Sequence, residues 1–425
     1  MKRKIHELLA VNFGSMLEWY DWTIYTLFAP YFAARFFPAS DPAAALLAAL
    51  AVFAAGFLTR PLGGFVFGFY ADRVGRKQSL TLAIFITAGG SLLIAVIPAF
   101  DSIGILASSV LLAARLAQGI AHGGEMGTSV TYLVEQAPQK RRALAGSTTW
   151  VSVVFGTILA TTTGLVINDT FSQAAIGAWA WRIPFALGGL LGLYGLYLRR
   201  RLTETDAFTT QHRQPDSQVA ALLRNWRGVA VVFGLSAGGS IMFYTWLIYT
   251  PIYAQLAHGL NARSALTASL MAQCVFLVAI PVVGWLADTF GRRVFIIVFG
   301  LGFMTLTFPL DRLIDNTFGG LLTALSLALM VLAALFGVNT AVWAEVFPTS
   351  IRATGVSGPL SLATAIFGGT APYVNTYLFK AGHHSWFLYY LVAVSSVTFL
   401  TGLLIPETRD LALDRADTGL LRNGS

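Results

Sequence analysis

Long apolar runs follow one another along almost the whole of this 425-residue chain. A helix needs about 20 apolar residues to cross a bilayer core about 30 Å thick. The pattern therefore predicts an all-α integral membrane protein with twelve transmembrane helices. The runs lie at roughly residues 8–36, 44–70, 78–98, 102–134, 143–167, 178–198, 228–254, 264–286, 294–310, 318–343, 353–379 and 386–405.

Composition excludes several other classes of protein. Only 11% of the residues are charged and 56% are hydrophobic, whereas soluble domains carry about 25% charged residues. The single cysteine, Cys274, excludes a disulfide framework and a thiolate metal site. The net charge of +8 is confined to short gaps between apolar runs, which is a topology signal and argues against a nucleic-acid groove. We expect no cofactor and no nucleic-acid partner.

Lysine and arginine are distributed unevenly between alternate gaps. The gaps on one side hold most of them, and the other side keeps only Arg35, Arg182, Arg263, Arg312 and Lys380. Basic residues favour the cytoplasmic side of a membrane. The distribution predicts a multi-pass protein of the cell inner membrane with both termini cytoplasmic. A carboxyl-terminal tag should therefore be inaccessible from outside intact cells.

An internal repeat divides the chain. GFYADRVGRK at 68–77 and GWLADTFGRR at 284–293 both fit G-x3-D-x2-G-R-[KR], and a second pair of motifs aligns Glu135 with Glu345 at a similar offset. Two six-helix halves with a site at mid-membrane depth are typical of such repetition. We therefore expect an N-terminal bundle at 1–198, a cytoplasmic linker at 199–227 and a C-terminal bundle at 228–425.

The two loop motifs resemble the signature of the major facilitator superfamily. Further stretches resemble its metabolite:proton symporter family: LEWYDW (17–22), FLTRPLGG (57–64), RLAQG (115–119), GGEMGTSVTYLVE (123–135), WRIPF (181–185) and ATAIFGG (363–369). The resemblance covers essentially the whole chain and is greatest to organic-acid permeases of the 2-oxoglutarate and citrate type. It implies two pseudo-symmetric bundles and proton-coupled symport by alternating access.

Three ionisable residues lie near the middle of their predicted spans. Asp21, Arg60 and Arg115 are each about 20 Å from an end of their helices, at a rise of 1.5 Å per residue. Charges at that depth must face the interior and find partners. The carboxyl-terminal half has no ionisable side chain at comparable depth in any predicted span.

Proton coupling is predicted for Asp21 and Arg115. In the wider superfamily, proton-coupled sugar carriers place a first-span acid beside a fourth-span arginine, and these positions match. A carboxylate that loses its arginine partner in a desolvated site takes up a proton. A permanent structural salt bridge is the alternative. Glu18 and Glu125 are further candidates for carrying a proton, and Glu125 is equally compatible with an inner gate.

Substrate binding is predicted chiefly for Arg60, whose planar guanidinium can hold two carboxylate oxygens at once. The alternative is that Arg60 pairs only with Glu18 or a backbone carbonyl. His122 and Glu125 form an H-x-x-E pair, but no third ligand is evident, so we expect no metal. The remaining substrate-binding candidates are Arg115, Tyr25, Gln118, Tyr244, Gln273 and Asn339.

Six further charged residues lie at the predicted inner ends of spans. We expect them to form charge networks that hold one conformation and release in the other, without contacting the substrate. These gating candidates are Asp72, Arg76, Glu135, Asp288, Arg292 and Glu345.

The sequence thus predicts a monomeric symporter that moves a proton and a small organic anion across the lipid bilayer, with a dicarboxylate such as 2-oxoglutarate as the first choice. Citrate or another tricarboxylate, and a zwitterionic osmolyte such as proline or betaine, are the alternative cargoes. An intramembrane enzyme with His122 and Glu125 as its acid–base pair would leave the internal repeat unexplained and lacks a nucleophile motif. No enzymatic activity is expected.

Overall fold

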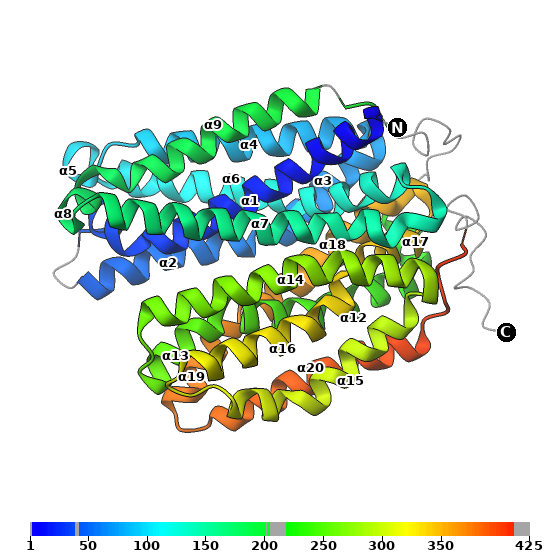
Figure 1. Ribbon diagram of the computed structural model, residues 1–425. Helices are drawn as coiled ribbons and strands as arrows, with labels where there is room; N and C mark the ends of the chain where they lie inside the picture. Colours follow the sequence, from blue (N-terminus) through cyan, green and yellow to red (C-terminus); the bar gives the residue numbers. More distant parts are fainter. Residues whose placement is uncertain (1, 39–41, 201, 205–217, 412–425) are drawn as a thin grey trace. The chain divides into compact units, whose positions relative to one another are not determined.

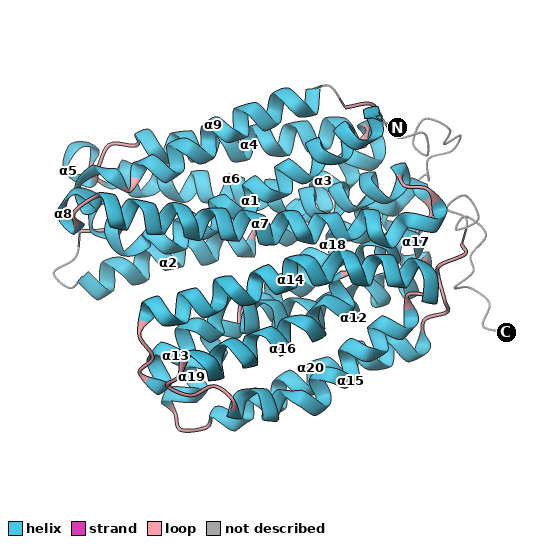
Figure 2. Cartoon of the chain, in the orientation of Figure 1, coloured by secondary structure: helices cyan, strands magenta, loops and turns pink. Residues whose placement is uncertain are grey.

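The computed structural model describes residues 2–38, 42–200, 202–204 and 218–411. Within these ranges the chain is almost entirely helical and contains no strand (Figure 2). Residues 205–217 of the predicted linker and the last residues, 412–425, lie outside the described ranges. The α-helical fold class predicted from the apolar runs is confirmed.

The first of two compact units comprises Met1–Ser129 and Ser152–Glu204. Within it α4 and α9 lie side by side, and α1 packs against α9 and α2 (Figure 1). Its helices are α1 (Lys2–Phe36), α2 (Pro42–Leu58), α3 (Arg60–Val74), α4 (Arg76–Val96), α5 (Phe100–Ile103), most of α6 (Ile105–Gln136), most of α7 (Arg142–Thr170), α8 (Gln173–Ala175), the π-helix η2 (Ile176–Ala180) and α9 (Arg182–Arg200).

The second compact unit comprises Val130–Val151 and Thr205–Ser425. Its α15 and α20 lie side by side, and α14 packs against α16 (Figure 1). Its elements are η1 (Gln139–Arg141), α11 (Gln218–Arg224), α12 (Trp226–Met242), η3 (Phe243–Tyr249), α13 (Thr250–His258), α14 (Ala262–Phe290), α15 (Arg293–Arg312), α16 (Phe318–Phe336), α17 (Asn339–Glu345), η4 (Thr349–Ile351), α18 (Arg352–Ala363), η5 (Thr364–Gly368), α19 (Ala371–Lys380) and α20 (His384–Leu404).

Helices occupy all twelve predicted ranges. Among the described residues, nine helices are long and apolar enough to cross a membrane, and the bent pair Gln173–Ala180 with Arg182–Arg200 makes ten. The two other predicted spans, α1 and the segment from α18 to α19, are not among these ten. The division by contacts places Val130–Val151 with the second unit, and the predicted boundaries at 198 and 228 stay a prediction.

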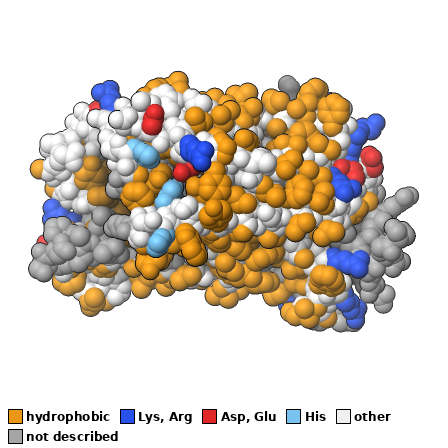
Figure 3. All heavy atoms as spheres, turned by 90° about the horizontal axis from the view of Figure 1, so that it is seen from below, with side chains coloured by type: hydrophobic (Ala, Val, Ile, Leu, Met, Phe, Trp, Pro, Cys, Tyr) orange, Lys and Arg blue, Asp and Glu red, His pale blue; other side chains and the backbone are white. Residues whose placement is uncertain are grey.

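One face of many helices is apolar and exposed. On α14, Met271, Val275, Val278 and Val282 recur every three or four residues and are each more than two-fifths exposed. Hydrophobic side chains also cover most of the middle of the face in Figure 3, with lysine and arginine gathered toward one end. Such surfaces suit lipid tails better than water. The chain is a multi-pass membrane protein.

The repeated loop motif has a structural reason for its second glycine. Gly75 and Gly291 hold φ values of 126° and 100°, which side chains with a Cβ rarely adopt. A helix follows each glycine, and a glutamate accepts hydrogen bonds from the first backbone N–H groups of that helix. Glu204 accepts from Arg76 and Lys77, and Glu407 accepts from Arg292 and Arg293. A carboxylate at a helix amino terminus satisfies otherwise unpaired donors.

Glycines also allow α6 to approach α2 and α3 closely. A Cβ on Gly63 would overlap the carbonyl oxygen of Ile120, and one on Gly123 would overlap the carbonyl oxygen of Arg60. Small residues at such contacts let helix backbones pack tightly within membranes. This close packing positions Arg60 and Arg115, which belong to the two neighbouring segments.

We expect Gly123→Ala to lower the unfolding temperature of the detergent-purified protein, because its methyl group would overlap backbone. Overpacking of this kind costs about 1–3 kcal/mol. Gly89→Ala on α4 is the matched control, since a Cβ there meets nothing within 4 Å. Equal unfolding temperatures for the two variants would show that α6 shifts without cost.

Candidate functional site

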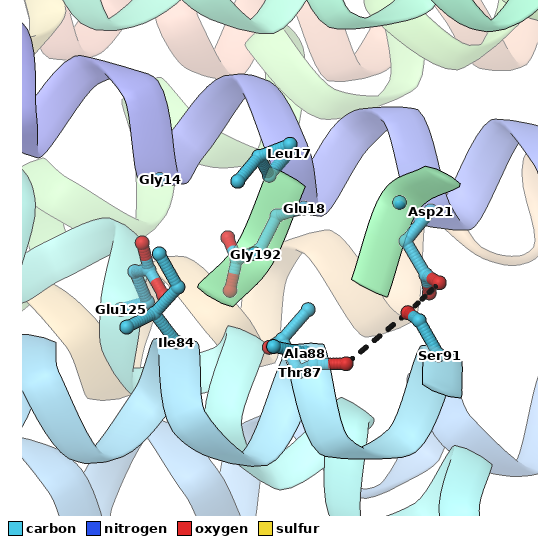
Figure 4. Close-up of a pocket in the computed structure, with 11 residues that line it drawn as sticks. Gly14, Leu17, Glu18, Asp21, Ile84, Thr87, Ala88, Ser91, Glu125 and Gly192 are labelled. Carbon is cyan, nitrogen blue, oxygen red and sulfur yellow. Dashed lines mark hydrogen bonds between the residues drawn. The ribbon is translucent and has the colours of Figure 1, made fainter. Parts of the chain in front are cut away.

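Asp21, near the middle of α1, is buried and surrounded by donors. Its Oδ2 accepts from Arg115 Nη1 at 2.8 Å and from Gln118 Nε2 at 3.2 Å. Its Oδ1 accepts from the hydroxyl of Ser91 on α4 (Figure 4). Gln118 also donates to the carbonyl oxygen of Thr87 at 3.2 Å. The structure therefore brings the predicted coupling pair into direct contact and adds Ser91 to it.

Arg115 is fully buried but uses only part of its guanidinium on Asp21. Its Cζ lies 4.1 Å from the centre of the Tyr25 ring, and the Tyr25 hydroxyl donates to the carbonyl oxygen of Ala49. Tyr25, a predicted substrate ligand, thus holds the arginine with its ring face. Arg115 Nε and Nη2 have no hydrogen-bond acceptor among the described residues. These two nitrogens remain for another anion.

Arg60 opens α3 and is also buried, with 2% of its surface exposed. Its guanidinium carbon lies 3.5 Å from the centre of the Phe57 ring and 4.3 Å from that of Trp22. Stacking on aromatic faces stabilises a guanidinium in a dry environment. Trp22 faces Arg115 as well, with its ring centre 5.7 Å from Cζ, so the two arginines share one aromatic wall.

Glu18, one turn before Asp21, contacts His122. Glu18 Oε2 lies 2.9 Å from His122 Nδ1. The sequence pattern pairs His122 with Glu125 on one helix face. In the structure the imidazole of His122 points toward α1, so that it lies beside Glu18 instead. Glu125 instead forms an ion pair with Arg199 of α9, and both side chains are buried.

Arg199 is the site residue that sequence reasoning missed. It follows the last apolar residues of a span and opens the run Arg199–Arg200–Arg201, which reads as a topology signal. The structure buries its side chain completely, and it donates to the carbonyl oxygen of Leu80 at 2.6 Å as well as to Glu125. Gly14 makes the room, since a Cβ there would overlap the guanidinium.

A small cavity lies between α1, α4, α6 and α9 of the first unit (Figure 4). It has room for about one water molecule. Glu18, Asp21 and Glu125 all line it, together with Thr87 and Ser91. The cavity therefore places the three acidic residues predicted to carry protons around one polar space.

The three substrate candidates of the second unit are buried in separate surroundings. Tyr244 lies in the π-helix η3 with its ring against Phe243, and Gln273 donates to Ser269 at 3.1 Å. Asn339 accepts from the indole N–H of Trp150 at 2.9 Å. Their role in substrate binding stays a prediction.

The gating candidates form buried ion pairs within each unit. In the first, Arg76 lies 3.1 Å from Asp72, and both are fully buried. In the second, Arg292 contacts Asp288 at 3.0 Å and Glu345 at 3.3 Å. The remaining candidate, Glu135, pairs with Arg352 at 2.8 Å. Arg352 was not among the predicted gating residues.

Asp288 does more than pair with arginine. Its two oxygens accept the backbone N–H groups of Ala143 and Leu144 at 3.0 and 2.9 Å, at the amino terminus of α7. The partial positive charge of a helix amino terminus favours a carboxylate there. All these residues, Val130–Val151 included, belong to the second unit. The pairs tie several helix ends of that unit together.

A membrane-spanning bundle with buried arginine–carboxylate pairs defines a membrane transporter. Residues 8–233 match the family described as "Sugar (and other) transporter". The chain is 37% identical to an alpha-ketoglutarate permease of Escherichia coli (strain K12), over 95% of this chain and 94% of that one. It is 34% identical to a citrate-proton symporter of Salmonella typhi, over 88% and 87%. It is 32% identical to a proline/betaine transporter of Escherichia coli (strain K12), over 96% and 85%.

The chain therefore belongs to the major facilitator superfamily and its metabolite:proton symporters. Among solved structures it is similar to the proton:xylose symporter XylE, with a TM-score of 0.84, 17% identity and coverage of 98% of this chain and 99% of that one. That likeness supports the twelve-helix fold. The protein is a transporter and not an enzyme, and its relatives support proton symport of a small organic substrate.

Since Asp288 holds helix ends and lines no substrate site, we expect Asp288→Asn to slow transport severalfold with little change in equilibrium substrate affinity. The amide keeps one acceptor but loses the charge that attracts Arg292. Transport rates in proteoliposomes and equilibrium binding on purified protein separate the two effects. Asp315→Asn, an exposed carboxylate after α15, is the control. A large affinity loss with a normal maximal rate would contradict a gating role.

Proposed function

We propose that the protein imports a small organic anion together with protons, by alternating access, and that the cargo is a dicarboxylate such as 2-oxoglutarate. The observation that carries this proposal is the buried Asp21–Arg115 pair, in which two nitrogens of Arg115, Nε and Nη2, have no acceptor among the described residues. An arginine with a carboxylate on one side and unused donors on the other can exchange one anion for another.

Coupling follows from that exchange. A cargo carboxylate that binds Arg115 Nε and Nη2 competes with Asp21 for the positive charge. Asp21 is 3% exposed, so an uncompensated negative charge there is strongly disfavoured. Proton uptake by Asp21 removes that charge, and Ser91 and Gln118 are at hand to hold the protonated carboxyl group. Release of the cargo restores the ion pair and expels the proton.

Cargo recognition rests on the two arginines that share Trp22. Arg60 and Arg115 are the buried cations nearest that ring, and each can hold a carboxylate in a bidentate manner. A dicarboxylate supplies two carboxylates for two guanidinium groups. Tyr244, Gln273 and Asn339 are proposed as neutral donors that complete cargo binding. A zwitterion would place its cation beside the two guanidinium groups, and a fully ionised tricarboxylate has one carboxylate more than the two guanidinium groups can hold.

The remaining features of the proposal concern assembly and placement. The relatives are bacterial, which supports placement in the inner membrane. The lysine and arginine distribution supports cytoplasmic termini. We propose a monomer as the transporting unit, since the buried site is built from residues of one chain.

Asp21→Asn should lower uphill accumulation of substrate while allowing exchange of internal for external substrate, because the amide cannot carry the proton that Asp21 takes up. Proteoliposomes with an imposed pH gradient measure both activities. Asp101→Asn, an exposed carboxylate on α5, is the control and should behave as the parent protein. A variant at Asp21 that concentrates substrate as steeply as the parent protein would remove Asp21 from the coupling mechanism.

The cargo assignment predicts that unlabelled dicarboxylates, but not proline or betaine, displace labelled 2-oxoglutarate from the purified protein. Arg60→Lys keeps the charge and loses the planar fork, so it should weaken 2-oxoglutarate binding by about 1–3 kcal/mol. Arg224→Lys, on the exposed surface of α11, is the matched control. Competition by the zwitterions alone would show that the cargo assignment is wrong.

A further inference from the structure

Two carboxylate oxygens in the first unit are buried without a donor. Glu18 and Glu125 are 2% and 1% exposed, and neither Glu18 Oε1 nor Glu125 Oε2 has a hydrogen-bond donor among the described residues. The second oxygen of Glu18 lies 2.9 Å from His122 Nδ1, and that of Glu125 pairs with Arg199 Nη2. A buried acceptor without a donor is destabilising, so the remaining oxygen of each glutamate lacks a partner that it needs.

The two carboxyl groups are close enough to supply that partner to each other. Their side chains line the same small cavity (Figure 4) and act electrostatically on each other. Two ionised carboxylates cannot hydrogen-bond, because neither has a donor. One proton between them converts two unsatisfied acceptors into a single charge-assisted hydrogen bond.

The surroundings of the pair favour one shared proton. Arg199 of α9 holds Glu125 from one side, His122 of α6 holds Glu18, and Arg60 and Asp21 act electrostatically on Glu18 from α3 and α1. The cavity also receives the hydroxyl of Thr87, which is buried and has no partner among the described residues. A water molecule there would connect the pair to Asp21, so a proton has a polar route between the two sites.

The balance of charge around the site gives the number of protons. Arg60, Arg115 and Arg199 carry three positive charges, and Glu18, Asp21 and Glu125 carry three negative charges when all are ionised, so 3 − 3 leaves no net charge with His122 neutral. A cargo dianion adds two negative charges that a buried site cannot hold uncompensated. Protons on Asp21 and on the Glu18–Glu125 pair leave 3 − 1, a net charge of two, which matches the dianion.

We propose that Glu18 and Glu125 share a second transported proton, so that a dicarboxylate dianion crosses with two protons and no net charge. The proton is shared between the two carboxyl groups, and Arg199 holds Glu125 in place. This inference rests on the proposed function, since it assigns the proton number of the same symport.

The test is the effect of membrane potential on uptake in proteoliposomes at pH 7, with potassium and valinomycin setting the potential. Uptake of 2-oxoglutarate by the parent protein should respond to a pH gradient and not to potential. Glu18→Gln keeps the Glu125–Arg199 pair and offers an amide N–H to Glu125 in place of the proton. It should carry one proton per dianion, so an inside-negative potential should slow its uptake.

Accumulation at equilibrium gives the same answer in numbers. At zero potential and a gradient of one pH unit, the parent should concentrate the dianion about 100-fold and Glu18→Gln about tenfold, because each proton contributes about 1.4 kcal/mol. Asp101→Asn should match the parent. Equal accumulation and equal potential dependence for the parent and Glu18→Gln would overturn the second proton while leaving proton symport standing. Parent uptake that does not respond to the pH gradient would contradict the proposed function itself. A sodium requirement of the parent that is lost in Glu18→Gln would show that the two glutamates bind sodium and not a proton.

Discussion

The burial of charge in a medium that solvates it poorly governs this structure. A single charged side chain at the centre of a membrane helix costs at least about 2.5–3.5 kcal/mol, and removing one partner of a buried pair costs about 3–5 kcal/mol. The buried carboxylates Asp21 and Glu125 each face an arginine, and Glu18 faces a histidine. These interactions let charged groups persist where the helices are otherwise apolar.

These ion pairs also leave some hydrogen-bond donors and acceptors without partners. Such groups suit the binding of an anion and a proton. Arg115 gives Asp21 only Nη1, and two of its donors have no acceptor in the described structure. Glu18 and Glu125 each keep one oxygen without a donor. A fully satisfied network would be a rigid structural element. An anion needs unused donors and a proton needs unused acceptors, and this site offers both close together.

Several of these residues could be predicted from sequence because a charge inside a long apolar run has few structural explanations. Asp21, Arg60 and Arg115 were recognisable on that ground, and the helical fold followed from run length. Arg199 was not, because it lies at the end of a run beside other arginines, as topology signals do. Ser91 and Thr87 look like ordinary hydroxyls that bond their own helix. Only three-dimensional packing reveals that they face the acidic residues, and that His122 contacts Glu18.

Both units bury ion pairs at helix ends, and the first unit also buries charge in mid-span. In the first, Asp72 pairs with Arg76 at a helix end, and three further carboxylates and their partners lie around a cavity, along α1 and α6. In the described part of the second, the buried carboxylates Asp288 and Glu345 lie at helix ends, bound to arginines and to backbone N–H groups. A charge at a helix end can gain or lose water at small cost, whereas one in mid-span must exchange a partner or a proton. The mid-span carboxylates of the first unit are therefore the ones suited to proton chemistry, and the ion pairs at helix ends suit a change of conformation.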